Sequence, residues 1–201
     1  MNQEIPTYVN CMEEVRDRIN LVRSVGEHNI TTGREVFDVE LVFVQLRKVL
    51  ELIAFASLTA NKDKYCAAHA NFATHWRAKS MLEELEKINP DFYPMPIQHP
   101  QLQPDGVKRI AVISGGFLTK EDFAVLYDKT GDILHVQNPF KVQAPRLNIK
   151  YSVKEWITRI QTLLALHIVH LVDDKKWVVQ IPESGPIYLW PAEPAQAVTG
   201  S

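Results

Sequence analysis

The segment YDKTGDILHVQNPF places an aspartate, a histidine and an asparagine around a central glycine. On a helix, Asp128, Gly131, His135 and Asn138 would form one stripe, because they follow one another at spacings of three and four. In a helix, Gly131 costs about 1 kcal/mol relative to alanine. In return it would open close access to the backbone beside His135. Such an opening would suit a partner helix or a phosphate-bearing ligand.

Two local structures are compatible with this segment. As a hairpin, FAVLYD and DILHVQ would be strands on either side of the turn KTG. As a helix, it would carry an apolar stripe of Phe123, Leu126, Tyr127, Thr130 and Leu134. The stripe favours a helix over about 119–137. In the competing interpretation Gly131 ends the helix and His135 lies on a strand.

The run LYDKTGDILH, preceded by long helices, resembles the HEPN domains (higher eukaryotes and prokaryotes nucleotide-binding). Their motif is an arginine, a short spacer and a histidine, often with Leu-Tyr one turn before the arginine. Leu126, Tyr127 and His135 match that pattern, and Lys129 stands where the arginine would be. The resemblance covers about 9–167. It implies a helical bundle that often dimerises, and in many members a metal-independent ribonuclease of defence or toxin–antitoxin systems.

The resemblance also implies roles for the candidate residues. His135 would be the base or a donor to phosphate, since histidine titrates near neutral pH. Lys129 would supply the positive charge that stabilises the phosphate in the transition state. Asn138 and Asp128 would orient the site. A lysine offers a point charge on a flexible stem, whereas an arginine offers a rigid bidentate fork.

Two functions therefore stay open. The first is a non-catalytic HEPN-like binding or interaction module, such as a component of a defence or toxin–antitoxin system. The second is a metal-independent ribonuclease that uses His135 with Lys129. The lysine and the mild acidity of the chain favour the binding module. The expected partners are a second copy of the chain, another protein or RNA.

Other motifs carry less chemistry. The chain has no HExxH or CxxC pattern, and the pair His167 and His170 has no carboxylate or cysteine at ligand spacing nearby. Neither a metal nor a cofactor is expected. RSVGEH sets Arg23 before His28 at the same kind of spacing, but Gly26 between them indicates the end of a helix.

The bulk composition limits the class of protein. The 201 residues carry a formal net charge of −2, which argues against a surface that coats nucleic acid. Two cysteines are too few for a disulfide framework. The N-terminus has no signal-peptide pattern, and charged residues interrupt the longest apolar run, LVFVQLRKVLELIAFASL. We expect a cytoplasmic protein without a membrane span.

These residues must be positioned by a mainly α fold, a helical bundle of about five helices with a small C-terminal antiparallel β-meander. A single domain is expected over 1–190, with the bundle over about 9–166. A proline-rich strap over 89–108 would pack on the bundle through Phe92, Tyr93 and Met95. The meander would cover about 167–190. The tail 191–201 is expected to be disordered. The predicted helices lie near 9–25, 33–60, 63–88, 119–137 and 151–167.

Overall fold

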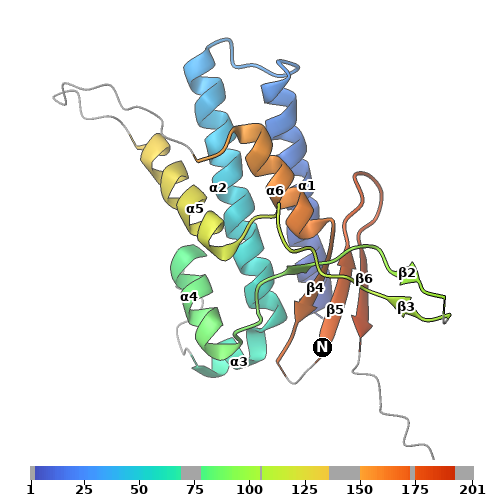
Figure 1. The fold of residues 1–201 in the computed structure, drawn as a ribbon. Helices are drawn as coiled ribbons and strands as arrows, with labels where there is room; N and C mark the ends of the chain where they lie inside the picture. Colours follow the sequence, from blue (N-terminus) through green and yellow to red (C-terminus); the bar gives the residue numbers. More distant parts are fainter. Residues whose placement is uncertain (1–2, 69–77, 105, 136–149, 173–174, 193–201) are drawn as a thin grey trace, which may run out of the picture.

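The computed structural model describes residues 3–68, 78–104, 106–135, 150–172 and 175–192. Its fold is mainly helical with a small antiparallel sheet in the C-terminal region, which confirms the predicted class. Figure 1 shows the long helices side by side above the sheet. The helices are α1 (Glu4–Gly26), α2 (Glu35–Ala60), α3 (Lys62–Ala68), α4 (Ala78–Ile88), α5 (Lys120–Leu134) and α6 (Val153–Leu164).

Helix α2 lies at the centre of the bundle, with α1 and α5 on either side of it in Figure 1. It contacts α1, α4 and α5. Its apolar side chains occupy most of its circumference, so water must be excluded from several sides at once. Fully buried side chains on α2 are Leu46, Val49, Leu50, Ile53 and Ala54. No described helix is long and apolar enough to cross a membrane.

Side-chain caps begin α5 and α6, whereas α1 and α2 begin without a side-chain cap hydrogen bond. Ser152 and Glu155 form a reciprocal capping box at the start of α6. Thr119 accepts from the backbone N–H of Asp122 at 3.1 Å at the start of α5. α1 begins at Glu4, earlier than the start near residue 9 that the sequence predicts. A proline in the first turn of α1 is tolerated there, since its missing N–H would have no intrahelical partner.

The segment predicted as one helix over 63–88 corresponds to two described helices, α3 and α4. Residues 69–77, between them, lie outside the described part of the chain. A buried asparagine pair joins the ends of α2 and α4. Asn89 donates to the side-chain oxygen of Asn61 at 2.8 Å and to the carbonyl of His170 at 3.0 Å. The side-chain amide of Asn89 thus connects the ends of two helices to the sheet.

The sheet contains the predicted meander and one strand that the sequence did not reveal. Its order is β1-β4-β5-β6, and every neighbouring pair is antiparallel. β1 belongs to the proline-rich strap, and its Met95 pairs with Ile168. A strand of two residues, one of which is a proline, has no alternating pattern to predict it. The bounds are β1 (Met95–Pro96), β4 (Leu166–His170), β5 (Lys176–Gln180) and β6 (Tyr188–Ala192).

The strap packs on the bundle as expected. Phe92 is fully buried, Met95 is half-buried, and the Tyr93 hydroxyl donates to the carbonyl of Leu118 at 3.0 Å. Past β1 the strap forms a second small sheet of β2 (Gln101–Leu102) and β3 (Lys108–Arg109). We call residues 98–112 the arm. In Figure 1 β2 and β3 project to the right, past β6.

The predicted tail begins too early. Pro191 and Ala192 belong to β6, where they pair with Trp177 and Lys176. A proline is compatible with this position because β6 is an edge strand. Residues 193–201 lie outside the described part of the chain.

A buried histidine joins the sheet to the first helix. His167 Nδ1 lies 2.8 Å from the carbonyl oxygen of Leu164, and Nε2 lies 2.7 Å from the hydroxyl of Tyr8. A carbonyl can only accept, so Nδ1 carries the proton and Nε2 accepts from Tyr8. Both side chains are fully buried, and Trp177 packs edge-on against the Tyr8 ring. The imidazole is therefore held neutral.

This arrangement predicts acid sensitivity. Burial lowers the pKa of His167 from its usual 6.5 to about 4. Between those values the unfolded chain takes up a proton that the folded chain does not. The free energy of unfolding should therefore fall as pH drops from 6.5 to 4, by roughly 3 kcal/mol from this group. Above pH 6.5 its contribution is complete and constant.

Urea unfolding across this pH range measures the effect. A His167→Gln variant should lose this part of the pH dependence. A His135→Gln variant, which changes an exposed histidine, should keep it. Equal pH slopes in the wild type and the His167→Gln variant would contradict the assignment.

Candidate functional site

The predicted site lies at the end of α5, which is a continuous helix from Lys120 to Leu134. The helix interpretation is confirmed as far as Leu134, and the hairpin is wrong. The helix also does not end at Gly131. His135 follows as the C-cap with extended backbone, and its N–H reaches the carbonyl of Gly131 at 3.3 Å. Asn138 lies outside the described part of the chain.

The apolar stripe of α5 faces the bundle as predicted. Phe123, Leu126, Tyr127 and Thr130 are buried, and Leu134 is half-buried. The four buried residues share one face of the helix, and the exposed face is mostly polar, with Val125 as an exposed apolar exception. Asp128 and His135 are exposed on that face.

The charged candidates are engaged with other charges. Lys129 Nζ lies 3.3 Å from a carboxylate oxygen of Asp132, one turn along the helix. Asp128 accepts from Lys79 of α4 at 3.0 Å. Among the described residues these two candidates pair with Asp132 and Lys79, not with His135. The structure therefore brings Lys129, Asp128 and His135 to one helix without joining them in one hydrogen-bonded group.

A different cation stands beside the Leu-Tyr pair. Arg47 of α2 lies over the Tyr127 ring, with the guanidinium carbon 4.1 Å from the ring centre. It also donates to the Tyr127 hydroxyl at 2.8 Å and pairs with Glu51 at 3.3 Å. Contacts to Thr130 Oγ1 and to the Tyr127 carbonyl, at 3.4 and 3.5 Å, are longer. This arginine connects α2 to α5.

Gly131 meets the same arginine. A Cβ atom built on Gly131 would lie 3.5 Å from Nη1 of Arg47, an ordinary van der Waals distance. The space beside the glycine is thus filled by an internal side chain. The sequence predicted that Gly131 opens access for a partner helix or a phosphate-bearing ligand. That opening is not needed to explain why a glycine stands at this position.

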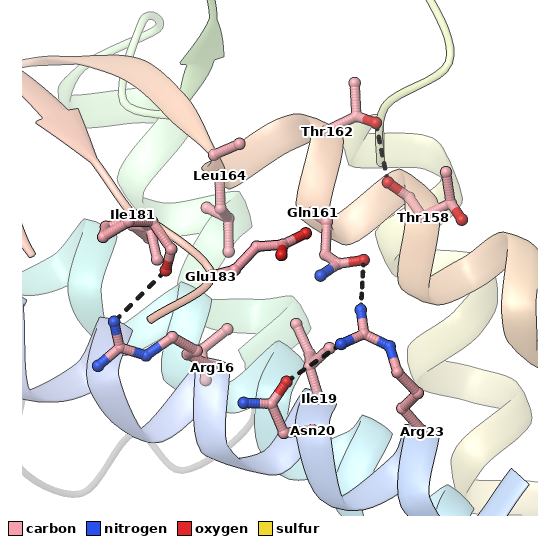
Figure 2. Close-up of a pocket in the computed structure, with 13 residues that line it drawn as sticks. Arg16, Ile19, Asn20, Arg23, Thr158, Gln161, Thr162, Leu164, Ile181 and Glu183 are labelled. Atoms are coloured by element: carbon pink, nitrogen blue, oxygen red, sulfur yellow. Dashed lines mark hydrogen bonds between the residues drawn. The ribbon is translucent and has the colours of Figure 1, made fainter. Parts of the chain in front are cut away.

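A second candidate site is a groove of about 290 Å³ between α1, α6 and the chain that follows β5. Figure 2 shows Arg16 and Arg23 projecting from α1 toward it. Arg16 donates to the carbonyls of Pro182 and Gly185, at 3.4 and 2.6 Å. These contacts hold the connection between β5 and β6 against α1.

The other arginine of the groove belongs to the second formal match of arginine and histidine. Arg23 donates to the side-chain oxygens of Asn20 at 3.3 Å and of Gln161 at 3.2 Å. α1 ends at Gly26 as predicted, and His28 follows it with a left-handed φ of 59°. The match in the sequence therefore spans a helix end. The contact of Arg23 with Gln161 was not predicted, because its partner on α6 is distant in the sequence.

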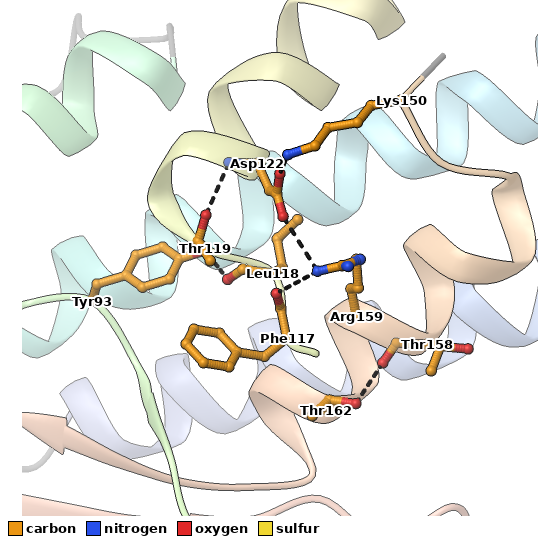
Figure 3. A network of polar contacts seen from close by, with 9 residues as sticks. All are labelled: Tyr93, Phe117, Leu118, Thr119, Asp122, Lys150, Thr158, Arg159 and Thr162. Atoms are coloured by element: carbon orange, nitrogen blue, oxygen red, sulfur yellow. Dashed lines mark hydrogen bonds and ion pairs between the residues drawn. The ribbon is translucent and has the colours of Figure 1, made fainter. Parts of the chain in front are cut away.

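A third polar cluster joins the start of α5 to α6 and is shown in Figure 3. The Asp122 side chain, which is 5% exposed, accepts from Lys150 at 2.6 Å and from Arg159 at 3.4 Å. Arg159 also donates to the carbonyl of Phe117 at 3.3 Å and stacks over the Tyr151 ring. The hydrogen bond with Asp122 raises the pKa of Lys150.

This cluster has the geometry of a structural contact that holds the start of α5 against α6. Its carboxylate is surrounded by cations, and its cations also contact a carbonyl and an aromatic face, so the buried charge is compensated. Within the described ranges, no group of three or more histidine, cysteine, aspartate or glutamate side chains could hold a metal ion.

Comparisons with known proteins do not add to this geometry. A scan of protein-family models, a search of curated proteins and a search of solved structures each give no match.

Gly131 provides a direct test of the helix interior. We expect Gly131→Ala to raise the free energy of unfolding by about 0.5–1 kcal/mol, because alanine favours the helix and its methyl group fits beside Arg47. As a control, Gly116→Ala should destabilise the protein by about 1 kcal/mol, because Gly116 has a φ of +79°. Urea unfolding measures both. A destabilised Gly131→Ala variant would show that the site requires a glycine.

The Asp122 cluster gives a second prediction. Asp122→Asn should lower the free energy of unfolding by about 2 kcal/mol, because hydrogen bonds to charged groups are lost from a buried position. Asp128→Asn, which changes an exposed ion pair, should leave stability nearly unchanged. Similar unfolding midpoints for the two variants would contradict the structural role of Asp122.

Proposed function

We propose that this chain is a HEPN-like binding module that docks a protein partner, in the first instance a second copy of itself. From the resemblance of the sequence to HEPN domains, we also propose that the protein acts in a defence or toxin–antitoxin system. The arm carries this proposal. Large aliphatic side chains are exposed along it: Leu102 at 68%, Ile110 at 47% and Val112 at 55%. Exposed apolar side chains gathered on one projecting element are typical of an interaction surface.

The backbone of the arm supports the same conclusion. In the described part of the chain, β2 and β3 pair with each other in a sheet of two strands. A sheet of that size is marginally stable in water by itself. β2, which pairs with β3 in the described part of the chain, is an edge strand, and an edge strand can pair with another chain through its backbone. Docking would cover the apolar side chains and this edge together.

The setting of Arg47 favours a module without nuclease activity. Cleavage of RNA needs a cation whose charge is available to a phosphate. Arg47, which stands beside Tyr127, already contacts a ring, a hydroxyl and the carboxylate of Glu51. Its side chain is 30% exposed. These contacts suit helix packing, and displacing them to bind phosphate would loosen α5 from α2.

Association in solution tests the proposal. We expect the purified protein to be a dimer by light scattering coupled to gel filtration. The double variant Leu102→Ser and Val112→Ser should be monomeric, because the apolar contact area of the arm is lost. Val36→Ser, at a residue 52% exposed at the start of α2, is the matched control and should remain a dimer. A monomeric wild type, or a dimer that survives the double variant, would contradict docking of a second copy through the arm.

A nuclease assay separates the two functions. The protein is incubated with single-stranded RNA in the presence of EDTA, beside a His135→Ala variant. We expect no cleavage above background by either protein. Cleavage by the wild type that the variant loses would establish the metal-independent ribonuclease and overturn the non-catalytic assignment.

A further inference from the structure

The groove between α1 and α6 has an apolar floor and a polar rim. Buried side chains from both helices form the floor, and Ile181 closes one end. Its volume of about 290 Å³ is close to the lower limit of ordinary ligand sites, which are ~300–1,000 Å³. The groove therefore suits a small molecule with an apolar body. The floor consists of Val15, Ile19 and Leu164, and the rim includes Arg16, Asn20, Arg23 and Gln161.

Two arginines give the rim its charge. Arg16 and Arg23 are seven residues apart on α1, so they lie on the same face, two turns from each other. The acceptors of Arg16 are backbone carbonyls, and those of Arg23 are side-chain amides. Among the described residues, neither guanidinium forms an ion pair with a carboxylate. Their positive charges are thus hydrogen-bonded but not neutralised.

The amides that contact Arg23 are oriented by it. An arginine can only donate, so Asn20 and Gln161 must turn their oxygens toward Arg23. Figure 2 shows their amide nitrogens pointing away from Arg23, toward the Arg16 side of the groove. Each amide nitrogen carries two N–H groups that can donate to a ligand. The groove thus has two cations at its rim and two oriented amide donors between them.

Glu183 is the acidic residue of the groove. Figure 2 shows it above the floor, between Arg16 and Gln161. It forms no ion pair with either arginine among the described contacts. Its charge opposes an anion in the groove. Removing that charge should therefore strengthen anion binding.

We propose that this groove binds a small organic anion. A carboxylate or a phosphate ester would accept from Arg23 and from the oriented amides, and its apolar body would cover Ile19 and Leu164. Arginine is suited to this role because its fork matches the oxygens of either group. The site lies on α1 and α6, apart from the arm and from α5, so it stands independently of the docking function.

An amide NMR titration with three probes tests the proposal. Phenyl phosphate and benzoate each combine an aromatic ring with an anion, and benzyl alcohol has the ring without the charge. We expect saturable shifts in signals of α1 and α6, with a Kd of about 1 mM or below for at least one anion. Benzyl alcohol should bind at least about tenfold more weakly. The better anion identifies the ligand class as a phosphate ester or a carboxylate.

Three variants locate the effect. Arg23→Gln should weaken anion binding about tenfold or more, since a charged hydrogen bond is lost. This change is preferred to one at Arg16, which also holds the backbone after β5. Glu183→Gln should tighten binding several-fold. Arg34→Gln, at an exposed arginine that stacks on Phe37, should leave it unchanged.

The titration has outcomes that overturn the proposal. These are the absence of saturable shifts with both anions, equal affinity for benzyl alcohol, and unchanged binding by Arg23→Gln. Weaker binding by Glu183→Gln, in a variant with a dispersed spectrum, would also overturn it. That variant keeps the test decisive if Arg23→Gln fails to fold.

Discussion

The enclosure of α2 is the constraint on which the other helices depend. A helix with apolar side chains on most of its circumference is stable in water only when several neighbours cover it. α1, α4 and α5 do this. Two polar residues of α2 lie where it meets those neighbours: Gln45 accepts from Arg18 of α1 at 2.6 Å, and Arg47 contacts Tyr127 of α5. Two of the residues that interrupt the apolar run thus connect α2 to adjacent helices.

Buried polar groups connect the bundle to its other parts. Asp122 joins the start of α5 to α6, Asn89 joins two helix ends to the sheet, and His167 joins β4 to α1. Each of these groups has its hydrogen-bonding partners in place. A satisfied polar contact is directional, and an unsatisfied one is expensive, so such contacts favour one packing arrangement over similar ones. The apolar core supplies most of the stability, and these contacts select the geometry.

Much of this fold could be predicted because its signals are local. The apolar periodicity of α2, the capping box at Ser152 and the alternating strands of the meander are all patterns within one segment. Contacts between distant segments were not predictable in the same way. β1 was missed because its pairing with β4 has no local pattern. The stripe of α5 was predicted, but the position of Arg47 beside Tyr127 and the meeting of Arg23 with Gln161 depend on how helices pack.

The hydrogen bond between Tyr8 and His167 has a consequence for how the chain folds as it is synthesised. α1 and α2 are consecutive and can pair early, because the loop that must close between them is short. The tyrosine of that helical pair acquires its buried partner only 159 residues later. β1 likewise waits for β4 before it can join a sheet. Until β4 emerges, the early helices keep an uncovered apolar face, so the interval between their synthesis and that of β4 is when the nascent chain is most exposed to aggregation.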